Sequence, residues 1–332
     1  MIISRTPFRI SFFGGGTDYP VYYKENGGSV LATTIDKYCY ITCRYLPPFF
    51  EHNHRIVYSK IENVKNISEI NHPSAKAVLQ YMKIDGGVEI HHDGDLPART
   101  GLGSSSSFTV GLLHAIYALK GKMPTKMQLA NEAIHIEQNI IKENVGSQDQ
   151  VSVAFGGFNR IDFDRDGMIR VNPVIIKKER LDKLQKYMMF YYTGISRIAS
   201  EVAKKQIEDT PKKKKELSDM HQMVDEALKI LNNEDGDVLD FGKLLHESWK
   251  LKKNLTEKIS TSEVDNIYEI AMKAGAVGGK LLGAGGGGFM IIFAEPDIQP
   301  KIRTRLMGLL EVPFKFENQG SQIIFYQPNG VY

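Results

Sequence analysis

The chain has 332 residues, of which 42% are hydrophobic and 24% charged, with a formal net charge of +3. This length accommodates two domains of ordinary size, and the composition is typical of globular proteins. The small net charge argues against a nucleic-acid partner, and no run of about 18 apolar residues predicts a membrane span. The first residues also lack a signal segment, so we expect a cytoplasmic protein without a membrane partner.

Strand signals dominate the first half of the chain. Apolar or alternating runs predict strands at residues 9–13, 29–35, 39–45 and 88–92, and a hairpin made of 151–155 and 157–163. Helices are predicted at about 104–120 and 125–143, the second with Thr125 as its N-cap. Cys39 and Cys43 share one face of a predicted strand, where we interpret them as packing residues.

Helices dominate the second half. The pattern predicts a strand at 187–192, helices at about 197–209, 212–232, 237–255, 263–274 and 297–310, and a last strand at 323–326. A glycine-rich loop between residues 283 and 288 runs into a further strand. Because strands and helices mix without strict alternation, we expect an α+β fold. We place the domain boundary near residue 175, which gives domains 1–175 and 176–332.

The segment Leu96–Ser107 reads LPARTGLGSSSS and lies between a predicted strand and a predicted helix. Glycine lets the backbone curl around a ligand, and a helix start presents N–H groups and a positive dipole end, so the segment predicts a phosphate site. No Gly-Lys-Ser or Gly-Lys-Thr follows, which excludes a Walker A loop. The expected phosphate-binding residues are Gly101, Leu102, Gly103, Ser104, Ser105, Ser106 and Ser107.

Two further glycine clusters occur, at Gly14–Gly16 and at Gly283–Gly288. The second cluster matches G-x-G-x-x-G, but a dinucleotide site needs a strand before that pattern and a helix after it. Here the predicted order is helix, loop and strand, so we reject a dinucleotide site. Three clusters in one chain favour converging phosphate or sugar contacts over three unrelated turns.

Two acidic residues stand out between the phosphate loop and the middle of the chain. Glu137 falls in the apolar stripe of the predicted helix 125–143, where a carboxylate is costly unless it is paired or binds a cation. The spacing leaves open a stripe-edge residue that reaches water or a lysine, and a metal ligand. Asp149 lies in a short polar loop, where a catalytic acid and an Asx turn or cap are alternatives. Asp18 allows the same two interpretations.

These features combine into one chemistry. Phosphoryl transfer from ATP needs a phosphate cradle, a Mg²⁺ ion held by oxygen ligands, and an acid that positions or deprotonates the acceptor hydroxyl. The loop 101–107, Glu137 and Asp149 would supply one part each. The set therefore indicates a kinase better than any member does alone.

Four segments resemble the GHMP kinase superfamily, in the order that the superfamily has them. They are PFRISFFGGGTDY at 7–19, PARTGLGSSSS at 97–107, GSQDQ at 146–150 and KLLGAGGGGF at 280–289. The resemblance implies an ATP-dependent small-molecule kinase of two α+β domains. The N-terminal domain would be like ribosomal protein S5 domain 2 and the C-terminal domain ferredoxin-like, with the active site between them. A homodimer stays open.

The resemblance also implies roles for single residues. Asp149 is similar to the catalytic base, with Arg9 beside it, and Glu137 and Ser105 resemble the Mg²⁺ ligands. Asp18 matches an aspartate that hydrogen-bonds sugar hydroxyls. Further substrate contacts are expected from Gly15, Gly16, Thr17, Gly285 and Gly286.

The first segment bears on the acceptor. Galactokinases read Gly-Glu-His before Thr-Asp-Tyr, whereas this chain has Gly14–Gly16 and so lacks a sugar-contacting glutamate. The motifs are most similar to D-glycero-D-manno-heptose 7-phosphate kinases, which phosphorylate an anomeric hydroxyl. Fucokinases and other sugar-1-kinases stay open, and a decarboxylase or a non-catalytic sugar sensor are further alternatives. A sugar phosphate needs a second anion site, for which Arg99, Arg197 and Lys280 are candidates; Arg197 could instead simply start a helix.

Overall fold

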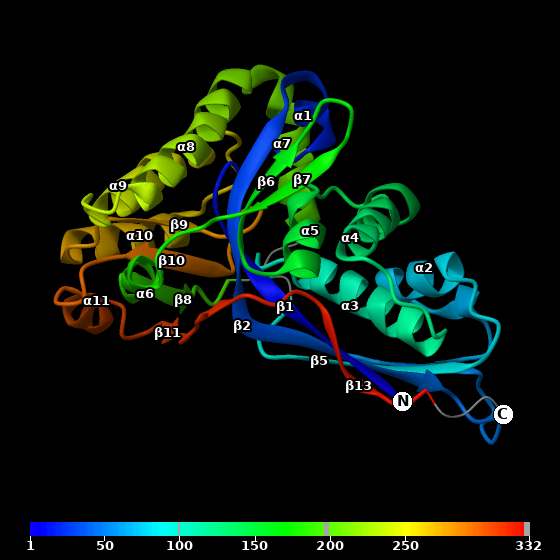
Figure 1. The fold of residues 1–332 in the computed structure, drawn as a ribbon. Coiled ribbons are helices and arrows are strands. Elements are labelled where there is room, and N and C mark those ends of the chain that lie inside the picture. Colours follow the sequence, from blue (N-terminus) through cyan, green and yellow to red (C-terminus); the bar gives the residue numbers. More distant parts are fainter. Residues whose placement is uncertain (99, 196–198, 329–332) are drawn as a thin grey trace.

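Two β-sheets with helices packed on them organise the chain (Figure 1). The computed structural model describes residues 1–98, 100–195 and 199–328. This arrangement confirms the expected α+β class. No helix in the described part of the chain has the length and apolar character that crossing a bilayer requires.

The first sheet is built on two long strands, β1 (Ile2–Phe13) and β2 (Gly28–Tyr45), which pair antiparallel along most of their length. Its order is β13-β1-β2-β5-β3-β4, and β6 and β12 pair with β2 while β7 pairs with β6. The remaining strands of this half are β3 (His54–Val57), β4 (Ile61–Val64), β5 (Val88–Gly94), β6 (Phe158–Phe163) and β7 (Ile169–Pro173). The long strands carry the first glycine cluster at the end of β1.

Helices cover one face of this sheet (Figure 1). They are α2 (Pro73–Tyr81), α3 (Ser104–Leu119), α4 (Lys126–His135) and α5 (Gln148–Phe155), while α1 (Pro20–Asn26) links β1 to β2. The central helix is α3, which packs on β1 and β2 and is buried over most of its length because nearly all its side chains are small or apolar. Thr125 caps α4 by accepting a hydrogen bond from the Gln128 N–H, as expected.

The second sheet has the order β11-β8-β10-β9 and is antiparallel throughout. Its strands are β8 (Met188–Tyr192), β9 (Gly278–Leu281), β10 (Phe289–Phe293) and β11 (Leu310–Glu311). The helices of this half are α6 (Lys178–Lys186), α7 (Ala199–Asp209), α8 (Lys214–Asn232), α9 (Leu239–Lys253), α10 (Ser262–Ala274) and α11 (Gln299–Arg305). Buried residues of both sheets join in one apolar cluster, so the two halves pack tightly against each other.

The end of the chain returns to the first sheet. β12 (Phe316–Glu317) pairs with β2, and β13 (Gln322–Tyr326) pairs with β1. The second half of the chain is therefore not one uninterrupted structural unit after residue 175, although β7, at the edge of the first sheet, does end at Pro173. The division into domains 1–175 and 176–332 stays a prediction.

Three element predictions were wrong in detail. Residues 151–155 form part of the helix α5 and not a strand; their apolar character reflects burial against α3 and α4, and Gly156 at φ +70° ends the helix. The predicted strands 29–35 and 39–45 are one continuous strand. The glycine loop 283–288 follows the strand β9 and not a helix, yet a strand still comes after it, so the rejection of a dinucleotide site is unaffected.

Candidate active site

The phosphate loop, residues 101–107, packs directly on the third glycine cluster. A Cβ atom added to Gly283 would lie 2.4 Å from the Gly101 Cα, and one added to Gly288 would lie 2.2 Å from the Thr100 carbonyl oxygen. Both glycines also have positive φ, at +71° and +105°. The close backbone contact therefore requires glycine, and it joins the first and second halves of the chain at the loop.

The loop ends at the N-terminus of α3, with Gly103 in the left-handed conformation just before the helix. Gly103 has no side chain, so no side-chain cap covers the start of the helix, and a helix N-terminus of this kind is a common anion-binding position. Side chains of the loop divide into two groups. Leu102 and Ser107 are fully buried, and the Ser107 hydroxyl donates to the Pro7 carbonyl, whereas Ser105 is exposed.

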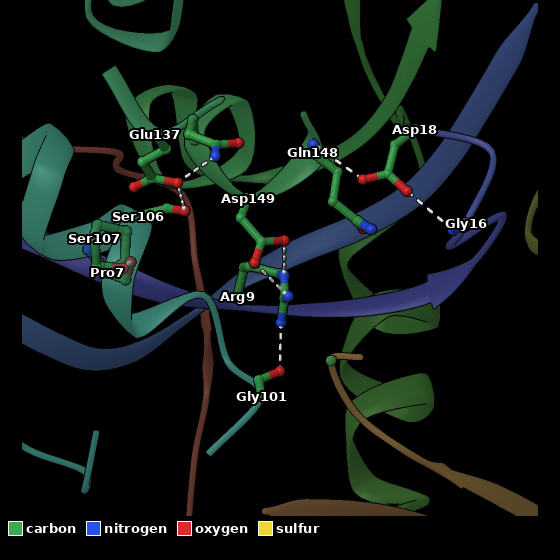
Figure 2. A network of polar contacts seen from close by, with 12 residues as sticks. Pro7, Arg9, Gly16, Asp18, Gly101, Ser106, Ser107, Glu137, Gln148 and Asp149 are labelled. Atoms are coloured by element: carbon green, nitrogen blue, oxygen red, sulfur yellow. Dashed lines mark hydrogen bonds and ion pairs between the residues drawn. The ribbon is translucent and has the colours of Figure 1, made fainter. Parts of the chain in front are cut away.

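The strand β1 and the helix α5 meet at a paired arginine and aspartate (Figure 2). Arg9 donates from Nε and Nη2 to the two carboxylate oxygens of Asp149, each at 2.7 Å, and from Nη1 to the Gly101 carbonyl at 2.7 Å. The Arg9 side chain is 4% exposed and that of Asp149 25% exposed. This bidentate geometry fixes the carboxylate while leaving part of it open. The structure thus brings the predicted pair together beside the phosphate loop.

Asp18 lies beside Gln148, the first residue of α5 (Figure 2). Its Oδ1 accepts from the Gly16 N–H at 2.9 Å and its Oδ2 from the Gln148 N–H at 3.3 Å. Burial raises the pKa of Asp18 above its usual value, and the nearby charge of Asp149 adds to this, whereas the Gly16 N–H opposes it. Asp18 therefore ties the first glycine cluster to the start of α5.

Glu137 lies in a short π-helix (Ile136–Ile140) that continues α4, a distortion that is frequent at functional sites. Its side chain is fully buried, and its Oε2 accepts from the Ser106 hydroxyl at 2.9 Å and from the Gln150 amide. Within the described residues, Oε1 has no hydrogen-bond partner. Burial raises the pKa of Glu137 to about 7, although the neighbouring hydroxyls and the Gln150 amide act in the opposite direction.

The serine beside Glu137 is therefore Ser106 (Figure 2) and not Ser105, which the motif had favoured. The two differ because α3 begins at Ser104, so that the side chain of Ser106 turns toward the buried π-helix and that of Ser105 toward solvent. The role of either serine at a metal ion stays a prediction. Among the described residues, no three His, Cys, Asp or Glu side chains come together as a metal site.

Sequence reasoning missed Lys252, near the end of α9. Its ammonium is buried and donates to the Gly283 carbonyl at 2.5 Å and to the Leu281 carbonyl at 3.3 Å. Burial lowers the pKa of Lys252 to about 7, and the charge of Arg9 lowers it further, while Asp18 and Asp149 oppose this. Lys252 thus hydrogen-bonds the backbone at the start of the third glycine cluster, and its charge interacts with Arg9 and Asp149.

Several residues predicted to contact the substrate make contacts within the fold, and their role toward a substrate stays a prediction. Lys280 is buried and donates to the Phe12 carbonyl at 2.7 Å, so its side chain joins the two sheets and is not a surface clamp. The Thr17 hydroxyl donates to the carbonyls of Gly14 and Ser29. Gly285 and Gly286 pack on the backbone of Ile259. Arg99 and Arg197 lie outside the described residues.

Comparison with known proteins identifies the family. The model of the GHMP kinase N-terminal domain matches residues 70–157, and that of the C-terminal domain matches residues 223–307. A Campylobacter jejuni protein named D-glycero-alpha-D-manno-heptose 7-phosphate kinase is 32% identical, over 89% of this chain and 90% of its own length. The chain belongs to the GHMP kinase family. It is a sugar kinase of that family, hence a phosphotransferase that acts on a hydroxyl group, and the family uses ATP as the phosphate donor.

Other relatives of this kinase are named for different sugars. A galactokinase of Pyrococcus furiosus is 28% identical over 99% of both chains. An L-fucokinase/L-fucose-1-P guanylyltransferase of Bacteroides fragilis is 25% identical over 92% of this chain but 36% of its own length. A crystal structure of a D-glycero-D-manno-heptose 1-phosphate kinase from Bacteroides thetaiotaomicron superimposes with a TM-score of 0.76, at 24% identity over 97% of this chain and 98% of the other. This likeness confirms the two-domain GHMP fold.

The raised pKa of Glu137 predicts a pH-dependent stability of the metal-free protein. The folded state keeps this proton up to about pH 7, whereas the unfolded chain releases it near pH 4.5, so the stabilisation is full below pH 4.5 and is lost as the pH rises through 7. We expect the free energy of unfolding of the wild type to fall by about 3 kcal/mol more than that of Glu137→Gln between pH 5 and 8. Urea unfolding in EDTA measures this difference; parallel curves for the two proteins would contradict it.

Proposed function

We propose that this kinase transfers the γ-phosphate of ATP to the anomeric hydroxyl of D-glycero-D-manno-heptose 7-phosphate, which gives the 1,7-bisphosphate. The Campylobacter jejuni relative carries the name of this activity and aligns over almost the whole chain. The glycine cluster Gly14–Gly16, in place of the glutamate of galactokinases, also supports an acceptor other than galactose. The observation that carries the transfer chemistry is the Arg9–Asp149 pair beside the phosphate loop.

Asp149 would orient the acceptor hydroxyl and take its proton. The hydroxyl oxygen then forms a bond to the γ-phosphorus, the bond from that phosphorus to the β–γ bridging oxygen breaks, and ADP leaves. Arg9 keeps the Asp149 carboxylate in one orientation through two hydrogen bonds, so no reorganisation is needed when the acceptor arrives. Its third donor, on the Gly101 carbonyl, couples this orientation to the phosphate loop.

The phosphate loop would hold the donor phosphates with backbone N–H groups at the start of α3. Gly103 supports a short distance between donor and acid, because a Cβ atom there would lie 3.4 Å from the Asp149 Oδ2. With glycine in this position, no side chain separates the loop from the carboxylate. A phosphate bound at the helix start would therefore have direct access to the acceptor hydroxyl.

Glu137 and Ser106 fit a Mg²⁺ ion that arrives with ATP. The Glu137 Oε1 is buried and, in the described part of the chain, has no partner, which is costly unless a cation or proton joins it. Mg²⁺ keeps several waters and usually takes one or two carboxylates plus substrate phosphates, so a complete protein cage is not needed. When bound, the ion would neutralise charge on the β- and γ-phosphate oxygens.

A sugar without a terminal phosphate is the second candidate acceptor. The buried position of Lys280 removes one of the three cations that the sequence offered for a second phosphate. The relatives named for fucose and galactose also support an acceptor without a terminal phosphate. A 1-kinase of an unphosphorylated sugar would use the same Arg9, Asp149 and phosphate loop.

A sugar panel tests the acceptor. We expect the purified protein with ATP and Mg²⁺ to turn over D-glycero-D-manno-heptose 7-phosphate with the highest kcat/KM, ahead of the same heptose without phosphate, fucose, galactose and mannose. ADP release coupled to a spectrophotometric assay measures the rates, and NMR of the product locates the new phosphate on the anomeric carbon. Higher kcat/KM for an unphosphorylated sugar would favour the second candidate instead.

Asp149→Asn tests the acid. Asparagine can still accept from Arg9 but cannot take a proton, so we expect kcat to fall at least about 100-fold while the Kd for ATP stays within about twofold. Asp164→Asn is a matched control, because Asp164 is also arginine-paired, to Arg170 at 2.7 Å, and has a similarly exposed side chain at 29%. Full turnover by Asp149→Asn, or an equal loss in the control, would refute the role.

Mg²⁺ binding can be followed without turnover. At pH 8 with ADP present, we expect Mg²⁺ to raise the thermal unfolding midpoint of the wild type, because a ligand that binds the folded state stabilises it. Glu137→Gln keeps the shape of the side chain but removes the charge, so the Mg²⁺-dependent increase should shrink by at least half. An increase of equal size in both proteins would place the ion elsewhere.

A further inference from the structure

The three glycines that follow β1 differ in whether the structure would tolerate a side chain at their position. Gly14 has φ +78°, and a Cβ atom there would lie 1.9 Å from the Ser29 carbonyl oxygen. Gly16 has φ +105°, and its Cβ atom would lie 2.6 Å from the Gln206 amide nitrogen and 2.9 Å from a Leu217 methyl group. The backbone and the packing therefore demand glycine at both positions.

Gly15 is under neither constraint. Its φ is not positive, and a Cβ atom there would make only ordinary contacts, at 3.7 Å to the Ser11 Oγ and 3.8 Å to the Gln148 Nε2. Apart from its own chain neighbours, no other described atom lies within 4 Å of that position. Gly15 is also the partly exposed member of the three. Glycine here leaves a space that opens to solvent, and the fold does not require it.

The walls of this space are polar groups that lack partners. Ser11 is 6% exposed, and in the described part of the chain its hydroxyl makes no hydrogen bond. The Gln148 side-chain oxygen is likewise buried, and no described group is bonded to it. An unpaired buried polar group is costly, so two of them around one open space indicate a polar ligand.

The space lies next to the reacting groups. Ser11 follows Arg9 by two residues on β1, so both side chains are on the same face of the strand, about 7 Å apart along it. Gln148 precedes Asp149 at the start of α5, and its N–H is bonded to Asp18 (Figure 2). A molecule that reaches Asp149 from the solvent side is thus within reach of Ser11 and Gln148.

We propose that the space beside Gly15 is a hydroxyl-binding subsite for the acceptor sugar, in which Ser11 and Gln148 hydrogen-bond one sugar hydroxyl. A hydroxyl fits because it both donates and accepts, as do the Ser11 hydroxyl and the Gln148 amide together. This inference rests on the proposed function, since it takes the acceptor to be a sugar. Gly15 then contributes to acceptor specificity because the absence of a side chain leaves room for the sugar hydroxyl.

Ser11→Ala separates a ligand role from a structural one. If the hydroxyl binds the acceptor, its removal should raise the KM for the sugar about 5- to 10-fold and leave the KM for ATP unchanged. The thermal midpoint should stay equal or rise, because an unpaired buried polar group has been removed. Ser248→Ala is the control, since Ser248 on α9 is also a fully buried serine whose hydroxyl lacks a partner among the described residues.

Gly15→Ala tests the space itself. We expect it to fold as the wild type does and to raise the KM for the sugar at least 10-fold, because the methyl group occupies the position of the hydroxyl. Gly14→Ala, where the backbone clashes, should instead lower the thermal midpoint, which shows that the assay detects a structural defect in this turn.

Wild-type turnover on the sugar panel alone decides the proposed function. The ratio of variant to wild-type KM, measured with whichever sugar is the best acceptor, decides the subsite. An unchanged sugar KM in both Ser11→Ala and Gly15→Ala would overturn the subsite while leaving the kinase assignment intact. Equal changes in the KM for ATP and for the sugar would overturn it as well, since they point to a general distortion of the site.

Discussion

The site depends on the bidentate ion pair between Arg9 and Asp149. One partner comes from the long strand β1 and the other from the start of α5, and a third hydrogen bond of the same guanidinium reaches the Gly101 carbonyl. A single planar group thus fixes the distance between a carboxylate and a phosphate-binding loop. The Arg9 side chain is almost fully buried, and its planar fork makes the three bonds at fixed directions, which the single ammonium of a lysine could not do.

Glycine makes this convergence possible. The phosphate loop and the third glycine cluster touch backbone to backbone at Gly101 and Gly283, a contact that any side chain would prevent. Two buried lysines hold the same region from the second half of the chain: Lys252 on the carbonyls of Leu281 and Gly283, and Lys280 on that of Phe12. Burial lowers the pKa of both lysine side chains. The domain interface and the site are therefore one structure.

Sequence patterns predicted the parts that local chemistry determines. The helix after the phosphate loop and the cap at Thr125 follow from spacing and capping. The pairing of Arg9 with Asp149, which are 140 residues apart, was instead implied by the family resemblance. The pattern failed where tertiary context decides. Lys252 belongs to a run with Lys250 and Lys253 in the last turn of α9, where basic residues are ordinary, and only the fold shows which of the three is buried. The apolar segment 151–155 read as a strand because it is buried, and burial alone does not distinguish a strand from a short helix.

The same limit applies to the acceptor. In the sequence, the three glycines at 14–16 are indistinguishable and indicate only a flexible backbone. The structure separates them, because the backbone at Gly14 and the packing at Gly16 exclude any side chain, whereas Gly15 would accept one and borders two unpartnered polar groups. Glycine at a position where the fold does not need it calls for a different cause, and the hydroxyl subsite proposed beside Asp149 supplies one. The proposed subsite therefore assigns part of the acceptor specificity to the space beside Gly15, in addition to the side chains of the motifs.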